Sequence, residues 1–280
     1  PVNLNIGLNA TYIWTRLTSI PEDLIYGDGA PEWDVPHVSQ TFQGRSPGEF
    51  WLIETDGIFK SQAEIDSHVS SDGTVIQPNA QPGDVRFVDA NDDGQITSEP
   101  VGGDRVFSGL GIAPWNAGLN INATYNNFDL TLSFYGNFGS KVYNGPKYLL
   151  EQPFGYDNFS PTLLGAYDAA TNPGSNFPRN NPNDLGENYN SRPDSDRYIE
   201  NGNFVKASLI QFGYRLPMSF SEKLGMSSPR VYVSGQNLFT ISGYEGIDPE
   251  QGRDGLISAG IDRGTAPQFR TILLGFSVNF

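Results

Sequence analysis

The chain has 280 residues, of which 37% are hydrophobic and none is cysteine. No run approaches the roughly 18 consecutive apolar residues of a transmembrane helix, and the lack of thiols excludes disulfides while fitting an exported protein. The net charge is -15, with 17 basic against 32 acidic residues. This balance argues against nucleic acid as a partner, because phosphate binding needs clustered Lys and Arg.

The first predicted strand covers residues 1–14. The residues between the apolar positions are mostly Asn, Gly or Thr. Apolar side chains occupy every second position, namely Val2, Leu4, Ile6, Leu8, Ala10, Tyr12 and Trp14. Such alternation is typical of a strand with one apolar and one polar face. The same pattern predicts strands at 115–125 and 128–138. Asn126 and Asn127 between them are a strong signal for a two-residue hairpin turn.

Three more strands follow along the chain. Residues 204–217 alternate, although the pattern fails near Lys206, and residues 229–240 are rich in strand-forming residues without a clear two-face pattern. Residues 269–280 alternate again and end on Phe280. Outer-membrane barrels characteristically end in this way, with a last strand that closes the barrel on a Phe. We therefore expect Phe280 to mark the periplasmic end of the final strand.

The connections between these strands are unequal. Long ones at 15–114, 139–203 and 241–268 alternate with short ones at 126–127 and 218–228, and the long ones carry all but two of the 32 acidic residues. This arrangement is typical of a barrel with loops at one end and tight turns at the other. We predict an all-β fold, an antiparallel transmembrane β-barrel segment of about six strands with long extracellular loops. The alternative is a soluble, loop-rich β domain.

A family resemblance runs through nearly the whole chain. It rests on the segments Thr55–Phe59 with Glu64-Ile65, Pro82–Ile96, Tyr125–Leu130, Asp196–Gly202 and Arg230–Phe239. In order and spacing these resemble the C-terminal part of SusC/RagA-like TonB-linked outer-membrane proteins.

The resemblance implies a larger assembly in the outer membrane of a Gram-negative bacterium. Residues 1–280 would be the C-terminal portion of one TonB-dependent receptor barrel of about 22 strands, a multi-pass protein with a plugged lumen. The plug and the TonB-contacting segment would lie outside this chain. Implied partners are a SusD-like lipoprotein lid, the TonB-ExbB-ExbD complex, outer-membrane lipid, and an oligosaccharide or peptide substrate.

Residues 89–97 give the best signal for a bound cation. The candidate ligands are Asp89, Asn91, Asp93, the Gln95 carbonyl and Thr97, which match the first nine positions of a calcium loop. Its twelfth position holds Pro100 instead of a carboxylate, and Glu99 and Asp104 are the nearest acids that could substitute. We expect a structural Ca2+ here. The alternative is a turn rich in Asn and Asp without metal.

Other candidate site residues are aromatic or polar. Tyr135 and Asn137 should point to the lumen, while Trp51 and Tyr244 in the loops are candidates for stacking on substrate; the alternative is that they pack their own loops. The two histidines lie in unrelated contexts, and no glycine-rich phosphate loop precedes a helix. We therefore expect no enzyme and no catalytic residue.

The functional expectation is TonB-dependent nutrient import, with capture and gated passage of oligosaccharides or peptides under a SusD-like lid. Two alternatives remain open from the sequence. One is a calcium-stapled surface β-module that binds glycan or protein, and the other is a non-transporting barrel that serves adhesion.

Overall fold

The computed structural model describes residues 2–21, 24–27, 29–30, 35, 37–153, 158–181, 189–217, 227–250 and 255–279. Phe280 and nearly all of the predicted short connection at 218–228 lie outside the described residues. No helix in the described part is long and apolar enough to cross a membrane.

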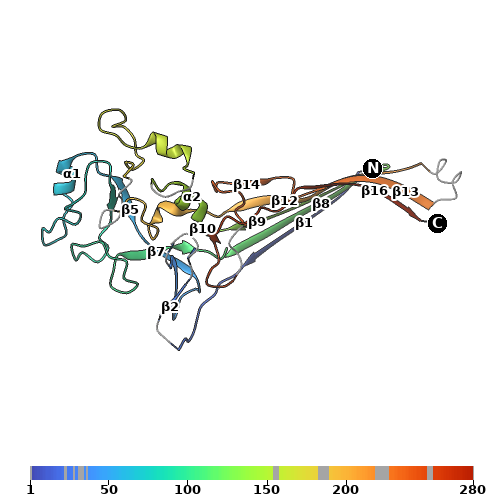
Figure 1. The fold of residues 1–280 in the computed structure, drawn as a ribbon. Coiled ribbons are helices and arrows are strands. Elements are labelled where there is room, and N and C mark those ends of the chain that lie inside the picture. Colours follow the sequence, from blue (N-terminus) through green and yellow to red (C-terminus); the bar gives the residue numbers. More distant parts are fainter. Residues whose placement is uncertain are drawn as a thin grey trace.

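Six long strands form one antiparallel sheet in which each pairs with the next. In order across the sheet they are β1 (Val2–Tyr12), β8 (Trp115–Tyr125), β9 (Phe128–Phe138), β12 (Phe204–Arg215), β13 (Ser227–Gln236) and β16 (Thr271–Asn279). A short strand, β14 (Thr240–Ser242), pairs with β12 beyond the end of β13. Each long strand overlaps a strand expected from the sequence, and the antiparallel all-β fold is confirmed. The sheet is open, with β1 and β16 at its edges (Figure 1).

The strand register aligns apolar residues across the whole sheet on one face. One such row runs Leu4, Ala123, Leu130, Phe212, Val233 and Leu274. The adjacent row, on the opposite face, runs Asn5, Asn122, Thr131, Gln211, Ser234 and Leu273. On the apolar face, Leu8 is 77% exposed and Leu274 is 81% exposed. A continuous, exposed apolar face of this size calls for an apolar neighbour.

A β-bulge explains why the alternation fails near Lys206. Along β12, Ala207 pairs with Phe134 and Leu209 pairs with Ser133, so Ser208 is an extra residue that has no register partner on β9. One extra residue moves every later side chain to the other face. Even-numbered residues of β12 therefore face the polar side before the bulge and the apolar side after it.

The three long connections fold into short elements that gather at one end of the six-stranded sheet (Figure 1). These are β2 (Leu24–Tyr26), β3 (Ser39–Phe42), β4 (Glu49–Ile53), β5 (Thr55–Ile58), α1 (Gln62–Asp66), β6 (Val85–Phe87), β7 (Arg105–Leu110), β10 (Lys141–Asn144), α2 (Gly145–Leu150), β11 (Ile199–Asn201), β15 (Ile261–Asp262), and 3-10 helices at Pro161–Gly165 and Asp196–Tyr198. We call the described residues of these connections the loop body.

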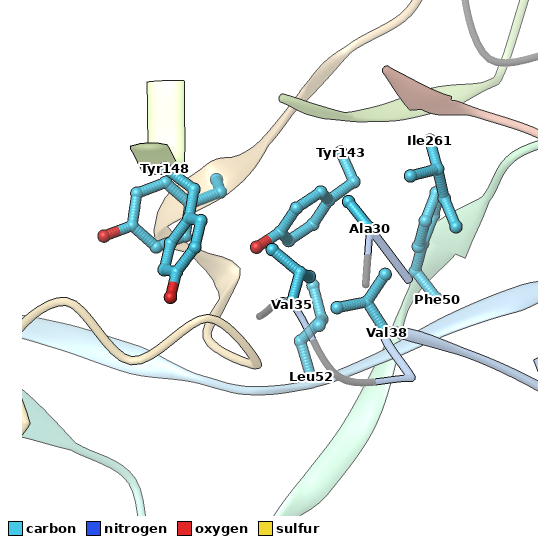
Figure 2. Close-up of a cluster of buried hydrophobic side chains, with 9 residues drawn as sticks. Ala30, Val35, Val38, Phe50, Leu52, Tyr143, Tyr148 and Ile261 are labelled. Carbon is cyan, nitrogen blue, oxygen red and sulfur yellow. The ribbon is translucent and has the colours of Figure 1, made fainter. Parts of the chain in front are cut away.

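A buried apolar core joins all three connections. Phe50 from β4, Tyr143 from β10 and Ile261 from β15 converge in it, although they lie in three different connections (Figure 2). The Tyr143 hydroxyl donates to the Pro193 carbonyl at 2.7 Å, and Tyr143 also meets Tyr198 edge-on. The loop body is thus a packed unit with its own core.

Buried ion pairs also link the first long connection to the second. Asp84, 1% exposed, accepts from Arg179 Nε at 2.5 Å and from Asn190 Nδ2 at 2.9 Å, both in the second connection. Arg105 donates to the Asp194 carboxylate across the same boundary at 3.1 Å. The first two connections are therefore fastened together by charge as well as by apolar packing.

Candidate functional site

The polar face of the sheet is a wall of small amide and hydroxyl side chains. Thr131 Oγ1 donates to Asn122 Oδ1 at 3.1 Å, and Ser133 Oγ donates to Asn120 Oδ1 at 2.8 Å, so β8 and β9 are bridged by side chains as well as by backbone. Such a surface offers hydrogen bonds to passing water or polar solute. It is the chemistry of a barrel interior rather than of an apolar core.

Aromatic rows mark both ends of the apolar face. At the end nearest the loop body, Tyr12 and Trp115 are register partners with ring centroids 4.8 Å apart. At the other end, Phe128 lies between Tyr125 and Tyr214, with its ring centroid 4.8 Å from that of Tyr214. Aromatic girdles at both interfaces are typical of membrane-spanning barrels.

Tyr135 and Asn137 lie on the polar face, where the sequence pattern placed them. Tyr135 is opposite Lys206 in the register, and its hydroxyl donates to Glu250 at 2.6 Å. Asn137 pairs with Phe204 two positions closer to the loop body. Both residues thus belong to the wall at its loop end, and contact with substrate stays a prediction.

Trp51 and Tyr244 lie in different surroundings. Trp51 is half-buried on β4, next to Phe42, with the Arg45 guanidinium 5.1 Å above its ring. Tyr244 is 8% exposed, and its hydroxyl donates to Asp262 at 2.6 Å. Burial, and then this hydrogen bond, raises the pKa of Tyr244 above its ordinary value. Tyr244 therefore packs the loop body, whereas Trp51 is only partly buried.

A cavity of about 310 Å³ lies beside this aromatic group. It is lined by Trp14 and Thr15 just after β1, and by Arg45, Glu49 and Phe107 from the loop body. Arg45 lies 5.0 Å from the Phe107 ring and pairs with Glu49 at 2.5 Å. Aromatic faces combined with a charged pair suit a polar ligand that has an apolar side, such as a sugar or a peptide.

Residues 89–97 form a tight loop whose side-chain oxygens turn inward. Asp89 accepts from the amides of Asp93 and Gly94, at 3.2 and 2.8 Å, and Asp93 accepts from the amide of Gln95 at 2.9 Å. Gly94 has a φ of 82°, which an L side chain rarely adopts. The loop therefore has the curl and the hard oxygen donors of a calcium loop.

The loop is closed by Asp104, which is fully buried. One carboxylate oxygen accepts from the Ala90 amide at 2.8 Å, and the other accepts from the Thr97 amide at 2.6 Å. Asp104 thus joins the two ends of the loop through the backbone. Among the described residues, no three His, Cys, Asp or Glu side chains form a metal site by themselves. A cation here would depend on Asp89 and Asp93 together with amide, carbonyl and hydroxyl oxygens.

Two carboxylates in the loop body differ in the direction of their pKa shifts. Burial by itself would raise the pKa of Asp194, but the charges of Arg192 and Arg105 outweigh it and hold that pKa below its ordinary value. For Asp196, burial raises the pKa despite the hydrogen bonds from Thr55. Asp194 is therefore an ionised anchor between the first two connections.

Sequence reasoning missed the roles of two residues. Lys206 is 2% exposed on the polar wall, between Tyr135 and two acids of the third connection. The available signal was a lysine inside a predicted strand, since a charged side chain buried there needs a group of opposite charge. The sequence suggests Asp104 only as a substitute ligand, and its hydrogen bonds from the Ala90 and Thr97 amides could not be read from spacing.

Comparison with known proteins gives a consistent result, although no protein-family model matches. The chain is 28% identical over 273 residues to TonB-dependent receptor P3 of Formosa agariphila, covering 95% of this chain and 25% of that protein. It is 29% identical over 208 residues to TonB-dependent receptor SusC of Bacteroides thetaiotaomicron, covering 74% of this chain and 18% of that protein. In sequence the chain resembles these TonB-dependent receptors, SusC among them. The resemblance seen in the sequence is thereby confirmed.

Solved structures agree on the fold of this SusC/RagA-like chain. The RagAB peptide transporter matches all of it with a TM-score of 0.71 at 20% identity, over 27% of that chain. The SusC/RagA-like chain spans about a quarter or less of the length of the curated relatives named above. What the relatives do as whole proteins therefore enters below as a proposal.

Proposed function

We propose that this SusC/RagA-like chain forms part of the wall of an outer-membrane barrel that imports nutrients in a TonB-dependent manner. The observation that carries the proposal is the two-faced sheet, which has an exposed apolar face between two aromatic rows and an amide-rich face behind it. Lipid would cover the first face, and the second would line the passage. The names of the relatives, all TonB-dependent receptors, support the same function.

The geometry of the connections supports an orientation. The loop body lies at one end of the sheet, and the hairpin turn at Asn126 and Asn127 lies at the other. In barrels of this class the long loops face outward and the short turns face the periplasm. We propose that the loop body is extracellular and meets a SusD-like lipoprotein lid. The TonB-ExbB-ExbD complex would act through parts of the receptor outside this chain.

We propose oligosaccharides or peptides as substrate. RagAB is described as a peptide transporter, and the partly buried Trp51 beside the Arg45–Glu49 pair offers both stacking and polar contacts. Tyr135 and Asn137 would line the passage below. Tyr244 would act indirectly, by fixing the third connection through Asp262.

Uptake by intact cells tests this function. A strain that lacks the full receptor gene would be supplied with labelled oligosaccharide and peptide pools, then complemented with the wild-type gene in TonB-positive and TonB-negative backgrounds. We expect the deletion to abolish uptake of one pool, and complementation to restore it only where TonB is present. Unchanged uptake of both pools, or a receptor recovered folded from the soluble fraction, would contradict the proposal.

We also propose that the 89–97 loop binds Ca2+ as a structural staple. Its oxygen donors would be Asp89, Asn91, Asp93, the Gln95 carbonyl and Thr97, with water at the remaining positions. Asp104 would hold the loop ends while the cation fixes its centre. The cation would stiffen a connection of about a hundred residues rather than take part in chemistry.

A further inference from the structure

A buried charge cluster joins the polar wall to the third connection. Lys206, on β12, lies opposite Tyr135, on β9, and both point to the polar face. Lys206 Nζ lies 3.4 Å from Asp248 Oδ2 and forms a second ion pair with Glu250. The Tyr135 hydroxyl donates to the same Glu250 carboxylate at 2.6 Å. One lysine and one tyrosine of the wall therefore hold two acids of the connection.

The chain reaches this cluster by folding back over the wall. After β14 it turns at Ser242, whose hydroxyl donates to the Asn203 carbonyl at 2.8 Å. It passes Glu245, which pairs with Lys147 of the loop body at 2.7 Å, and then returns to the wall at Asp248. We call residues 243–250 the strap. The strap covers Lys206 so fully that 2% of it remains exposed.

The positive charge of Lys206 determines whether the strap can lie against the polar wall. Asp248 and Glu250 are drawn together at the wall, where the Asp248 carboxylate also accepts from the Glu250 amide at 3.0 Å. Without Lys206 the two carboxylates would be poorly solvated neighbours of like charge, and both would be more stable in water. Removing the lysine therefore favours a strap that leaves the wall.

We propose that Lys206 is a positioning residue that holds the strap folded against the inner wall, so that the strap narrows the passage at its loop end and sets the size of solute that enters. This rests on the proposed function, because the polar face must be the inside of a barrel. Lys206 acts through the strap and need not touch substrate itself.

The test uses the full receptor with Lys206→Met, which removes the positive charge at this position, and Lys206→Arg, which keeps it. Arg230→Met is the matched control, since Arg230 pairs with Asp129 on the same face, farther from the loop body and without contact to the strap. Strap mobility is read from a spin label at Ile247→Cys, a 71% exposed strap position in a chain without cysteine. Passage beyond the strap is read in separate receptors that carry Ser133→Cys on the polar wall, as the rate at which a large hydrophilic maleimide added from outside reacts with this cysteine.

We expect Lys206→Met to free the spin label and to raise the maleimide reaction rate at least threefold, while Lys206→Arg and Arg230→Met remain like wild type. Retained heat-modifiable migration shows that the barrel is folded in each variant. An immobile spin label or an unchanged maleimide reaction in Lys206→Met would overturn the proposal, and so would an equal increase in Arg230→Met. Neither readout requires substrate uptake, so failure of the import function would be recognised separately in the uptake assay.

Discussion

Trp115 and Tyr125 stand at opposite ends of β8 on the same apolar face, ten positions apart. At about 3.3 Å per residue, and with a strand tilt near 45°, this places the two rings about 23 Å apart along a membrane normal. The apolar band of an outer-membrane barrel is about 25 Å tall and is bounded by aromatic girdles. The two residues therefore delimit a band of the right height.

A charge placed in the middle of this band should destabilise the barrel. Leu132 lies between Ile121 and Ile210 in the central apolar row. We expect Leu132→Arg to lower the free energy of unfolding by about 2–4 kcal/mol, because the guanidinium would face hydrocarbon. Ser133→Arg, on the polar face, is the control and should cost under about 1 kcal/mol. Urea titration of the full receptor in lipid vesicles measures both, and equal losses would contradict the assignment of faces.

The calcium proposal predicts a specific pattern of loss. Asp89→Ala and Asp93→Ala should each weaken calcium binding at least tenfold, since each removes a charged ligand. Asp92→Asn is the control, because Asn tolerates the positive φ of 62° at this position and the Asp92 side chain accepts from the Ser71 amide at 2.7 Å, outside the loop centre. Calorimetric titration measures binding. If proteolysis of the wild-type loop is the same with calcium and with chelator, the cation has no structural role there.

Closure of the same loop by Asp104 makes a prediction that is independent of calcium. In Asp104→Asn, the amide nitrogen that replaces one oxygen cannot accept a backbone N–H. One amide at the Ala90 or Thr97 end is then left without its acceptor, at a cost of about 1–3 kcal/mol. Hydrogen exchange of residues 89–97 should accelerate by tenfold or more, while Glu99→Gln should change it little. Unchanged exchange in Asp104→Asn would show that the loop does not need this carboxylate.

The ionised state of Asp194 makes the loop body sensitive to acid. Its pKa is depressed by Arg192 and Arg105 despite burial, so its contribution to stability is present above the unfolded value of 3.8 and is lost as the pH falls through the folded value. The Ile53 amide, which donates to the Asp194 carbonyl at 2.8 Å, is a local reporter. Its exchange, corrected for the intrinsic rate, should rise on acidification below about pH 4. Asp194→Asn should remove this pH dependence, and a pH profile identical to wild type would contradict the linkage.

The long strands could be predicted because their signal is local. Alternation along β1, β8 and β9 reflects one apolar and one polar face, and Asn126 takes the positive φ of 51° that a two-residue turn requires. The bulge at Ser208 hid the pattern of β12, since it reverses the faces halfway along the strand.

The loop body could not be predicted in the same way. Its short strands hold two to six residues, and β10 pairs with a strand of another connection, Tyr143 lying opposite Ile261, so no local period marks them. The core and the Asp84–Arg179 pair join residues about a hundred positions apart. The candidate calcium ligands could be recognised as a motif in the sequence. The ion pairs of Lys206 could not, because their acids lie in the third connection.

Accessibility of single cysteines in the membrane-embedded receptor tests the two-faced wall most directly. Ile121→Cys on the apolar face and Asn122→Cys on the polar face are adjacent on β8, and the chain has no cysteine of its own. Labelled with a fluorophore, position 121 should be quenched by lipid carrying a nitroxide on its acyl chain, and position 122 by a water-soluble quencher. Quenching of both positions from water, or the reverse assignment, would contradict the account.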